Sequence, residues 1–388
     1  MTRIRAPMLF LEHDAKELLA VQGIPIPGGI QLAQAPTAAA QEKDEATGHW
    51  RVKPQVLIRT AGHAPRALSA RTNAEIADAA AKLLAATIDG QTVHAVLVER
   101  AVQSRSVARL SFQCEPRTAG IRIQVGDGAA DGAASSPTHS EIVAPDPTAV
   151  IAGVQRLSTA LSPEARSSVA AAGRMLAPLY FGYEAILMEI DPLMILADGS
   201  WMVGDVRMAI DEAALFRHPE LITLLERRDA YGNIRQLRAT GVDYRVLDPN
   251  GSVATIACGA GHCAYLLDEL IARGLKPYDF MDAGPAMLNG PPERLDDVLQ
   301  WLQKAAGLRC ILVAVGEGAI DLTAFAQHLA AALGRAEGLK TPVVARFAGT
   351  GAGAAGAILQ QASGRVLLEP DIGLALDRVA AQVAGAPG

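Results

Sequence analysis

The sequence of 388 residues is poor in aromatic residues and in cysteine. Aromatic side chains make up 4% of it although 50% of its residues are hydrophobic, so its interior must consist mainly of Ala, Val, Leu and Ile, as in layered α/β proteins. The four cysteines, Cys114, Cys258, Cys263 and Cys310, lack the CxxC spacing of zinc sites and show no disulfide framework. We therefore expect a protein of the reducing cytoplasm, without structural zinc or disulfides.

An excess of basic charge and long apolar segments are also missing. With 35 basic and 41 acidic residues, the net charge of −6 leaves no sustained basic face for a nucleic-acid backbone. The apolar stretch at residues 256–271 contains Asp268 and Glu269, so no run reaches the roughly 18 uncharged residues of a membrane span. Glu12 and His13 interrupt the N-terminal pattern where a signal peptide is apolar. We expect no nucleic-acid partner, membrane insertion or export.

Helical and strand patterns alternate along the first part of the chain. The length predicts about two or three domains. An amphipathic helical pattern begins near residue 8 and stops at Gly23, before an extended Ile-Pro-Ile-Pro segment. Further helices are predicted at residues 74–86, 163–177 and 221–238, strands at residues 56–59, 94–99, 185–190 and 201–203, and a mobile surface excursion at residues 126–147.

The last part of the chain shows a different pattern. Strands are predicted at residues 253–257, 310–315, 342–346 and 365–368, and helical segments separate them. Such a series of βαβ units forms a parallel sheet covered by helices. We therefore divide the chain into domains at residues 1–240 and 245–388.

Two acidic residues flank the turn between the strands predicted at residues 185–190 and 201–203. Asp191 follows the first of these strands and Asp205 follows the second. Antiparallel strands can bring both carboxylates together, and Mg²⁺ typically takes one or two protein carboxylates, with phosphates and water completing its shell. The spacing alone is equally compatible with two solvated acids at strand ends.

Several segments, in the same order along the chain, resemble the β subunits of ADP-forming succinyl-CoA synthetase. They are residues 11–19, which read Leu-Glu-His-Asp-Ala-Lys-Glu-Leu-Leu, and residues 23–27, 187–220, 250–284 and 342–346. The resemblance implies an ATP-grasp domain at residues 1–240 and a flavodoxin-like ligase domain at residues 245–388. It also implies that Asp191 and Asp205 hold Mg²⁺.

The resemblance implies an acid–thiol ligase subunit that binds ATP, magnesium and a small carboxylic acid. An α-type partner would carry CoA and a transiently phosphorylated histidine, so no catalytic histidine is expected in this chain, and the assembly would be an αβ heterodimer or heterotetramer. The division is chemically sensible, because a thiol can attack a carboxylate only after phosphoryl transfer has made one oxygen a leaving group.

The nucleotide contacts implied by the resemblance fall on three residues. Glu99 matches an acid of the adenine and ribose region, whereas the second acid of that region is replaced by Val107. The phosphate-binding lysine corresponds to Lys53 in one register and to Arg59 in another, and we prefer Arg59 because Pro54 would interrupt a central strand. The glycine-rich phosphate loop corresponds to residues 59–66, which contain one glycine.

In the C-terminal domain the resemblance implies anion-binding turns. Cys258, Gly259 and Gly261 precede a predicted helix at residues 262–273, whose N-terminal N–H groups could face a substrate carboxylate or phosphohistidine. Gly318 lies in a second such turn, together with Glu317; Asp321 follows it. Like charges about 4 Å apart repel by roughly 4 kcal/mol at an effective dielectric near 20, so these acids disfavour succinate itself as the substrate.

Three functions remain open on the sequence alone. The first is a working ligase subunit with an altered acid substrate. The second is a non-catalytic, β-like binding or assembly subunit, which the missing glycines and the acids at 317 and 321 favour. The third is an ATP-grasp ligase that forms an amide bond.

Overall fold

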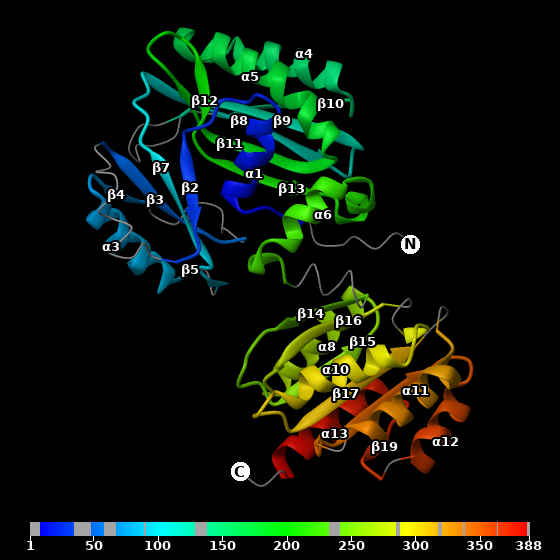
Figure 1. The fold of residues 1–388 in the computed structure, drawn as a ribbon. Helices are drawn as coiled ribbons and strands as arrows, with labels where there is room; N and C mark the ends of the chain where they lie inside the picture. The colour runs from blue at the N-terminus through cyan, green and yellow to red at the C-terminus, as the bar shows by residue number, and fades with distance from the viewer. Residues whose placement is uncertain are drawn as a thin grey trace. The chain divides into compact units, whose positions relative to one another are not determined.

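The chain folds into two compact units, residues 1–230 and residues 231–388, here called unit 1 and unit 2 (Figure 1). The computed structural model describes residues 8–34, 48–57, 67–88, 91–128, 138–232, 241–284, 288–316, 320–336, 338–362 and 364–385. Within these residues, no helix is both long and apolar enough to cross a membrane.

Unit 1 contains a seven-stranded sheet with the order β1-β13-β11-β8-β9-β10, and β12 pairs with β11 beside it. Every pairing in this sheet is antiparallel. Helices α4 and α5 cover one of its faces, where Val154, Val169 and Leu176 are fully buried (Figure 1). The strands are β1 (Met8–Leu9), β8 (Ser106–Glu115), β9 (Gly120–Asp127), β10 (His139–Val143), β11 (Ala185–Ile195), β12 (Trp201–Val203) and β13 (Val206–Ile210), and the helices are α4 (Pro147–Ser158) and α5 (Pro163–Gly182).

A four-stranded antiparallel sheet with the order β2-β7-β3-β4 forms the second layer of unit 1. Helix α3 packs on it through Ile76 and Ala80, against Val52, Val96 and Val98 of the strands. These elements are β2 (Gly29–Leu32), β3 (Trp50–Gln55), β4 (Leu68–Ala70), α3 (Asn73–Leu84) and β7 (Ala95–Arg100). Unit 1 also contains α1 (Glu12–Val21), the short pair β5 (Thr87–Ile88) and β6 (Gln91–Thr92), η2 (Glu212–Arg217) and α6 (Pro219–Glu226), with η3 (Asp229–Tyr231) at its end.

The position of β3 corrects one sequence prediction. The strand covers Trp50–Gln55, whereas Val56 and Leu57, in the segment predicted as a strand, lie outside any strand. Pro54 is part of β3 and lies opposite Val96 of β7. The described part of β4 pairs only with residues 50–52, so Pro54 lies beyond the point where β3 has strands on both sides. The reason for preferring Arg59 over Lys53 therefore fails.

Two further predictions for unit 1 need correction. The excursion expected at residues 126–147 includes strand β10, which pairs with β9 through Ile142 and its neighbours. Helix α4 follows immediately. Its N-cap is Asp146, whose carboxylate accepts a hydrogen bond from Ala149 N at 2.9 Å. The helix predicted at residues 221–238 is seen as α6, which ends at Glu226.

Unit 2 is a six-stranded sheet with the order β14-β16-β15-β17-β18-β19. Strands β15 to β19 are parallel and follow the 2-1-3-4-5 order of flavodoxin-like domains, and β14 is an antiparallel edge strand. The strands are β14 (Val242–Val246), β15 (Val253–Ala257), β16 (Asp279–Ala283), β17 (Cys310–Gly316), β18 (Val343–Ala348) and β19 (Val366–Leu368). The predicted mixed α/β class, with a flavodoxin-like C-terminal part, is thus confirmed; β14 and β16 were not predicted.

Helices cover both faces of the unit 2 sheet, as Figure 1 shows. Alternate residues of β17 enter the two layers: Ile311 and Val313 pack on the side of α10, α11 and α12, and Leu312 and Ala314 pack on the side of α8 and α13. This alternation explains why the strand reads as a continuous apolar run. The helices are α8 (Ala260–Ala272), α10 (Glu293–Gln303), α11 (Leu322–Arg335), α12 (Ala352–Ala362) and α13 (Ile372–Gly385).

A buried acid in unit 2 makes its stability depend on pH. The Oδ1 atom of Asp279 accepts hydrogen bonds from Thr255 N at 2.8 Å and Thr255 Oγ1 at 3.1 Å. Burial raises the pKa of Asp279 to about 7, although the bonds from Thr255 oppose the shift. Because the folded pKa lies above that of the unfolded chain, the native state holds this proton more tightly. The resulting stabilisation is complete below about pH 4 and is lost as the pH rises through about 7.

Asp279→Asn should remove this pH dependence. We expect the free energy of opening of unit 2, measured by hydrogen exchange of β15 and β16 amides, to fall less between pH 4 and 8 than in the wild type. The difference should be on the order of a few kcal/mol. Asp377→Asn, at a carboxylate that is 64% exposed, is the control and should leave the profile unchanged. Parallel profiles for the wild type and Asp279→Asn would contradict the assignment.

Candidate active site

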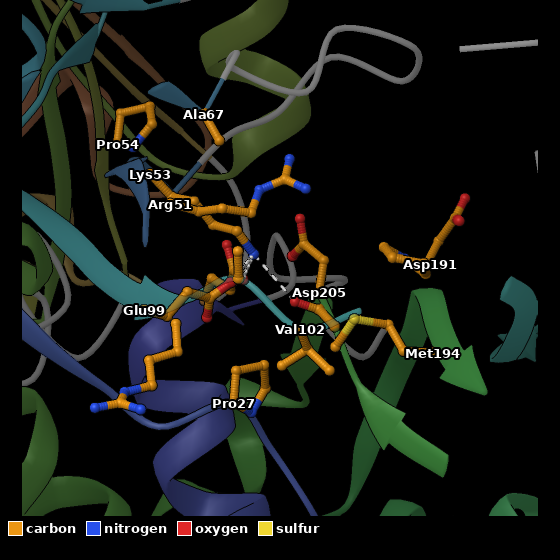
Figure 2. A pocket seen from close by; sticks show the side chains of 15 residues that line it. Pro27, Arg51, Lys53, Pro54, Ala67, Glu99, Val102, Asp191, Met194 and Asp205 are labelled. Atoms are coloured by element: carbon orange, nitrogen blue, oxygen red, sulfur yellow. Dashed lines mark hydrogen bonds and ion pairs between the residues drawn. The ribbon is translucent and has the colours of Figure 1, made fainter. Parts of the chain in front are cut away.

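A cavity of about 510 Å³ lies in unit 1, between the four-stranded sheet and the hairpin formed by β11 and β12 (Figure 2). Helix α1 and strands β3 and β7 line one part of it, and the hairpin lines the other. Its charged lining residues are Glu12, Arg51, Lys53, Glu99, Arg100, Asp191 and Asp205. This volume is within the range of about 300–1,000 Å³ that is typical of small-molecule and cofactor sites.

The two hairpin acids lie opposite each other. The pairing of β11 with β13 ends at Ile190 and Val206, and Asp191 N continues it by donating to Asp205 O at 3.3 Å. Residues directly opposite in an antiparallel pair project from the same face, and both Asp191 and Asp205 line the cavity (Figure 2). Both predicted acids therefore line one cavity, and the binding of a single metal ion by the two of them stays a prediction.

The approach of the strands beside these acids depends on a glycine. Gly204 N donates to Pro192 O at 2.9 Å, and a Cβ atom at Gly204 would lie only 2.9 Å from the same oxygen.

Burial raises the pKa of Asp191, and Glu189 adds to the effect, while Arg109 opposes it. A carboxylate in such surroundings is stabilised when a cation binds beside it.

Behind the acids, two lysines and two glutamates form a buried ion cluster, here called the Lys–Glu quartet. Lys16 Nζ lies 2.8 Å from Glu12 Oε1 and 2.6 Å from Glu99 Oε2. Lys53 Nζ lies 2.7 Å from Glu12 Oε1 and 2.6 Å from Glu99 Oε1. The four side chains are at most 10% exposed, and their formal charges cancel.

The quartet is joined to the hairpin through one carbonyl. Gly204 O accepts hydrogen bonds from Lys16 Nζ at 2.8 Å and from Lys53 Nζ at 3.0 Å. An ammonium group has three N–H donors, so the carboxylates and this carbonyl satisfy both lysines. Burial opposes the charge on Lys53, but Glu12, Asp205 and Glu99 together raise its pKa above the ordinary value. Lys53 is therefore held as a cation.

The structure places four of the predicted site residues around the cavity of unit 1. Lys53 and Glu99 are in direct contact, and Asp191 and Asp205 line the same cavity. Arg59, together with the loop at residues 59–66, lies outside the described residues. The residues that the sequence did not assign to the site include Glu12, Lys16 and Arg51. The spacing of Glu12 and Lys16 on one helical face was the available signal for the first two.

In unit 2 the predicted turn lies at the point where the strand order reverses. Cys258, Gly259 and Gly261 follow the C-terminal end of β15, between β16 and β17, where open α/β sheets bind ligands. Gly259 has a φ of 93°, which favours glycine, and its N–H donates to Asp282 Oδ1 at 2.8 Å. A side chain at Gly259 or Gly261 would meet no described atom within 4 Å, so the backbone is open there.

The second predicted turn of unit 2 is only partly described. Gly318 and Glu317 lie outside the described residues. Asp321 is the N-cap of α11, and its Oδ1 accepts from Thr323 N at 3.0 Å and Ala324 N at 3.1 Å. The helix N-terminus thus stabilises this charge. Of the two acids expected to disfavour a dicarboxylate substrate, Asp321 is thus used as a helix cap, and Glu317 is the other.

Another group of possible metal ligands lies at the start of α1. One ligand atom from each of His13, Asp14 and Glu17 falls within 4.8 Å of the others. Arg228 Nε lies 3.2 Å from Asp14 Oδ1, so a cation already neutralises the most buried of these carboxylates. The arrangement is explained as an ion pair between α1 and the end of unit 1.

Comparison with known proteins places the chain in a wider group. No family model matches it. It is 28% identical to the β subunit of ADP-forming succinate–CoA ligase from Chloroflexus aurantiacus over 359 residues, covering 90% of this chain and 93% of the relative. It is also 28% identical to the ADP-forming β subunit 1 of Archaeoglobus fulgidus, covering 87% and 89%, and to the GDP-forming β subunit of Thermus thermophilus, covering 87% and 90%.

Among solved structures, the fold is similar to ATP citrate lyase from Methanothrix soehngenii, with a TM-score of 0.73 at 15% identity. The match covers 96% of this chain and all of that chain, so it establishes the fold of both units. The fold and the relatives together define an ATP-grasp-type acid–thiol ligase. Within that class, the chain is a divergent homologue of the β subunits of succinate–CoA ligase, and the predicted resemblance, fold class and enzyme class are confirmed.

Loss of one lysine from the quartet should destabilise unit 1. Lys16→Met leaves Glu12 and Glu99 with a single buried counter-charge, and removing one partner of a buried ion pair typically costs about 3–5 kcal/mol. Glu12→Gln added to Lys16→Met restores the charge balance and should recover part of the loss. Hydrogen exchange of α1 and β3 amides measures the effect in unit 1 alone.

The control for this prediction is an exposed pair with the same helical spacing. Lys82 Nζ lies 2.6 Å from Asp78 Oδ2, but both side chains are about two-thirds exposed. Lys82→Met should change the stability by less than about 0.5 kcal/mol. An equally small effect of Lys16→Met would show that the quartet does not stabilise the fold.

Proposed function

We propose that the chain is the β-type subunit of an ATP-dependent carboxylic acid–CoA ligase and works with an α-type partner in the cytoplasm. The observation that carries this proposal is the pair Asp191 and Asp205, which line one cavity together with Lys53 and Glu99. In the proposed assembly the partner provides CoA and the histidine that carries phosphate. The small carboxylic acid and the partner are inferred from the relatives.

The donor set at the hairpin fits a magnesium ion. Two carboxylates on one face provide the hard oxygen ligands that Mg²⁺ takes from proteins, and the cavity beside them leaves room for phosphate oxygens and water. Asp191 and Asp205 would hold the ion. When bound, it would neutralise part of the negative charge of the phosphates during phosphoryl transfer.

The chain's own residues divide the remaining tasks. Glu99 and the backbone carbonyls after β7, at Ala101 and Val102, would provide acceptors for the base and ribose of ATP. Arg59 would contribute from the loop at residues 59–66. The quartet fixes the charged wall of the cavity in position before the nucleotide binds. Such preorganisation favours the transfer of the charged phosphoryl group.

The turn of unit 2 suits the second half of the reaction. The N-terminal N–H groups of α8 beyond Gly259 can donate hydrogen bonds to a carboxylate or to a phosphohistidine, and Cys258 and Gly261 border the same position. Gly318, which lies outside the described residues, is proposed to bind the same group. Phosphorylation turns one carboxylate oxygen into a leaving group, after which the thiol of CoA attacks the acyl carbon and phosphate departs.

A second candidate is a non-catalytic β-like subunit that serves assembly. The observation that favours it is the complete use of the Lys53 donors inside the protein, which leaves none for a phosphate. This candidate predicts no binding of MgATP by the chain. Calorimetry with MgATP therefore separates the two.

The ligase proposal is tested by replacing the second hairpin acid. We expect Asp205→Asn to lower acid-dependent ADP formation about a hundredfold or more when the chain is co-expressed with its α-type partner, because several kcal/mol of charge stabilisation are lost. Glu189→Gln is the control. Glu189 lies on the same hairpin, 3.7 Å from Arg207, and does not line the cavity, so activity should stay within about twofold.

The same assay decides between the candidates. No turnover over a broad panel of carboxylic acids, combined with no binding of MgATP, would reject the ligase and support the assembly subunit. Dependence on an amine in place of CoA would instead indicate an amide-forming ligase.

A further inference from the structure

Three cationic side chains line the cavity of unit 1, and they differ in what they already contact. Lys53 contacts Glu12, Glu99 and Gly204 O at 2.6–3.0 Å, so its three N–H donors are used. The Arg100 guanidinium lies over the ring of Trp50, 5.3 Å from the ring centroid. The Arg51 side chain forms no hydrogen bond or ion pair with any residue that the structure describes.

The position of Arg51 follows from the alternation of β3. Arg51 and Lys53 are two residues apart and therefore project from the same face of the strand. Arg51 pairs with Glu99 in the register of β3 and β7, but both carboxylate oxygens of Glu99 are directed at the two lysines. Figure 2 shows the Arg51 side chain extending into the cavity, whereas the interactions drawn converge on the Lys53 ammonium.

We propose that Arg51, rather than Lys53, is the residue that contacts the phosphate chain of the nucleotide in this protein. The inference rests on the proposed function, because it concerns the nucleotide bound in that cavity. Lys53 could donate to a phosphate only by releasing Glu12, Glu99 or Gly204 O. Releasing a carboxylate would leave a buried negative charge beside the incoming phosphates.

The chemistry of arginine suits this task. The guanidinium presents five donors in a planar fork, matches two phosphate oxygens at once and stays charged at every physiological pH. An exposed guanidinium without an internal partner loses no ion pair when the ligand binds. Arg51 thus provides a positive charge at the wall of the cavity, whereas the segment that corresponds to the glycine-rich phosphate loop, residues 59–66, contains a single glycine.

The test is calorimetric titration of the full chain with MgATP, MgADP and adenosine. Arg51→Gln should weaken MgATP and MgADP binding about tenfold or more, because charge-assisted bonds to phosphate are lost. Adenosine binding should stay within about twofold, because it has no phosphate. Arg51→Lys should fall between the wild type and Arg51→Gln, since an ammonium keeps the charge but not the fork.

The matched control is Arg71→Gln, at an exposed residue after β4 that does not line the cavity. It removes the same charge at a position next to the same sheet and should leave MgATP binding within about twofold. Thermal unfolding of each variant confirms that it is folded, and Arg51 is exposed, so its replacement should not change the melting temperature.

The outcomes separate this inference from the proposed function. If the wild type binds MgATP and Arg51→Gln binds it equally well, Arg51 is only a solvated surface residue and the inference is wrong, while the proposed function stands. An equal loss for Arg71→Gln and Arg51→Gln would also reject it, because the effect would be one of net charge. If the wild type binds no MgATP, both the inference and the proposed function fail.

Discussion

The interaction on which the rest of unit 1 depends is the buried Lys–Glu quartet. Helix α1, strand β3 and strand β7 each contribute to it, and the Gly204 carbonyl joins it to the hairpin that carries Asp191 and Asp205. Four formal charges in a dry interior are tolerated only when each has its partners, so the elements must meet in one arrangement. The cavity beside the quartet therefore has charged walls that are in place without a ligand.

The parts of this arrangement that the sequence predicted are local. Asp191 and Asp205 are joined by one short hairpin, and the turn around Gly199, with a φ of 81°, is marked by Asp-Gly in the sequence. Lys16 could be paired with Glu12 from its helical spacing. Its contact with Glu99 could not be predicted, because 83 residues separate them and no local pattern records which strand faces α1.

The misplaced strand has a physical cause as well. Residues 50–55 read Trp-Arg-Val-Lys-Pro-Gln and alternate between apolar and polar residues, with Val52 in the apolar core and Lys53 among buried charges. The prediction was instead drawn to the more continuously apolar residues 56–58 and away from Pro54. Burial of polar groups in an ion cluster cannot be distinguished from exposure by hydropathy alone. In unit 2 no such cluster interrupts the inner strands, and β15 and β17 were found within one residue of their observed bounds.

The shared carbonyl of Gly204 also limits how the protein can move. Lys53 of β3 and Lys16 of α1 both donate to that one oxygen, and Lys16 also contacts Glu99 of β7. Moving the four-stranded sheet away from the β11–β12 hairpin would therefore break the Lys53 bond together with a contact of Lys16. The hydrogen bonds to Gly204 O thus hold the hairpin against the quartet. Any opening or closing of the cavity must then come from segments that these bonds do not hold. A ligand enters between walls whose separation is already set.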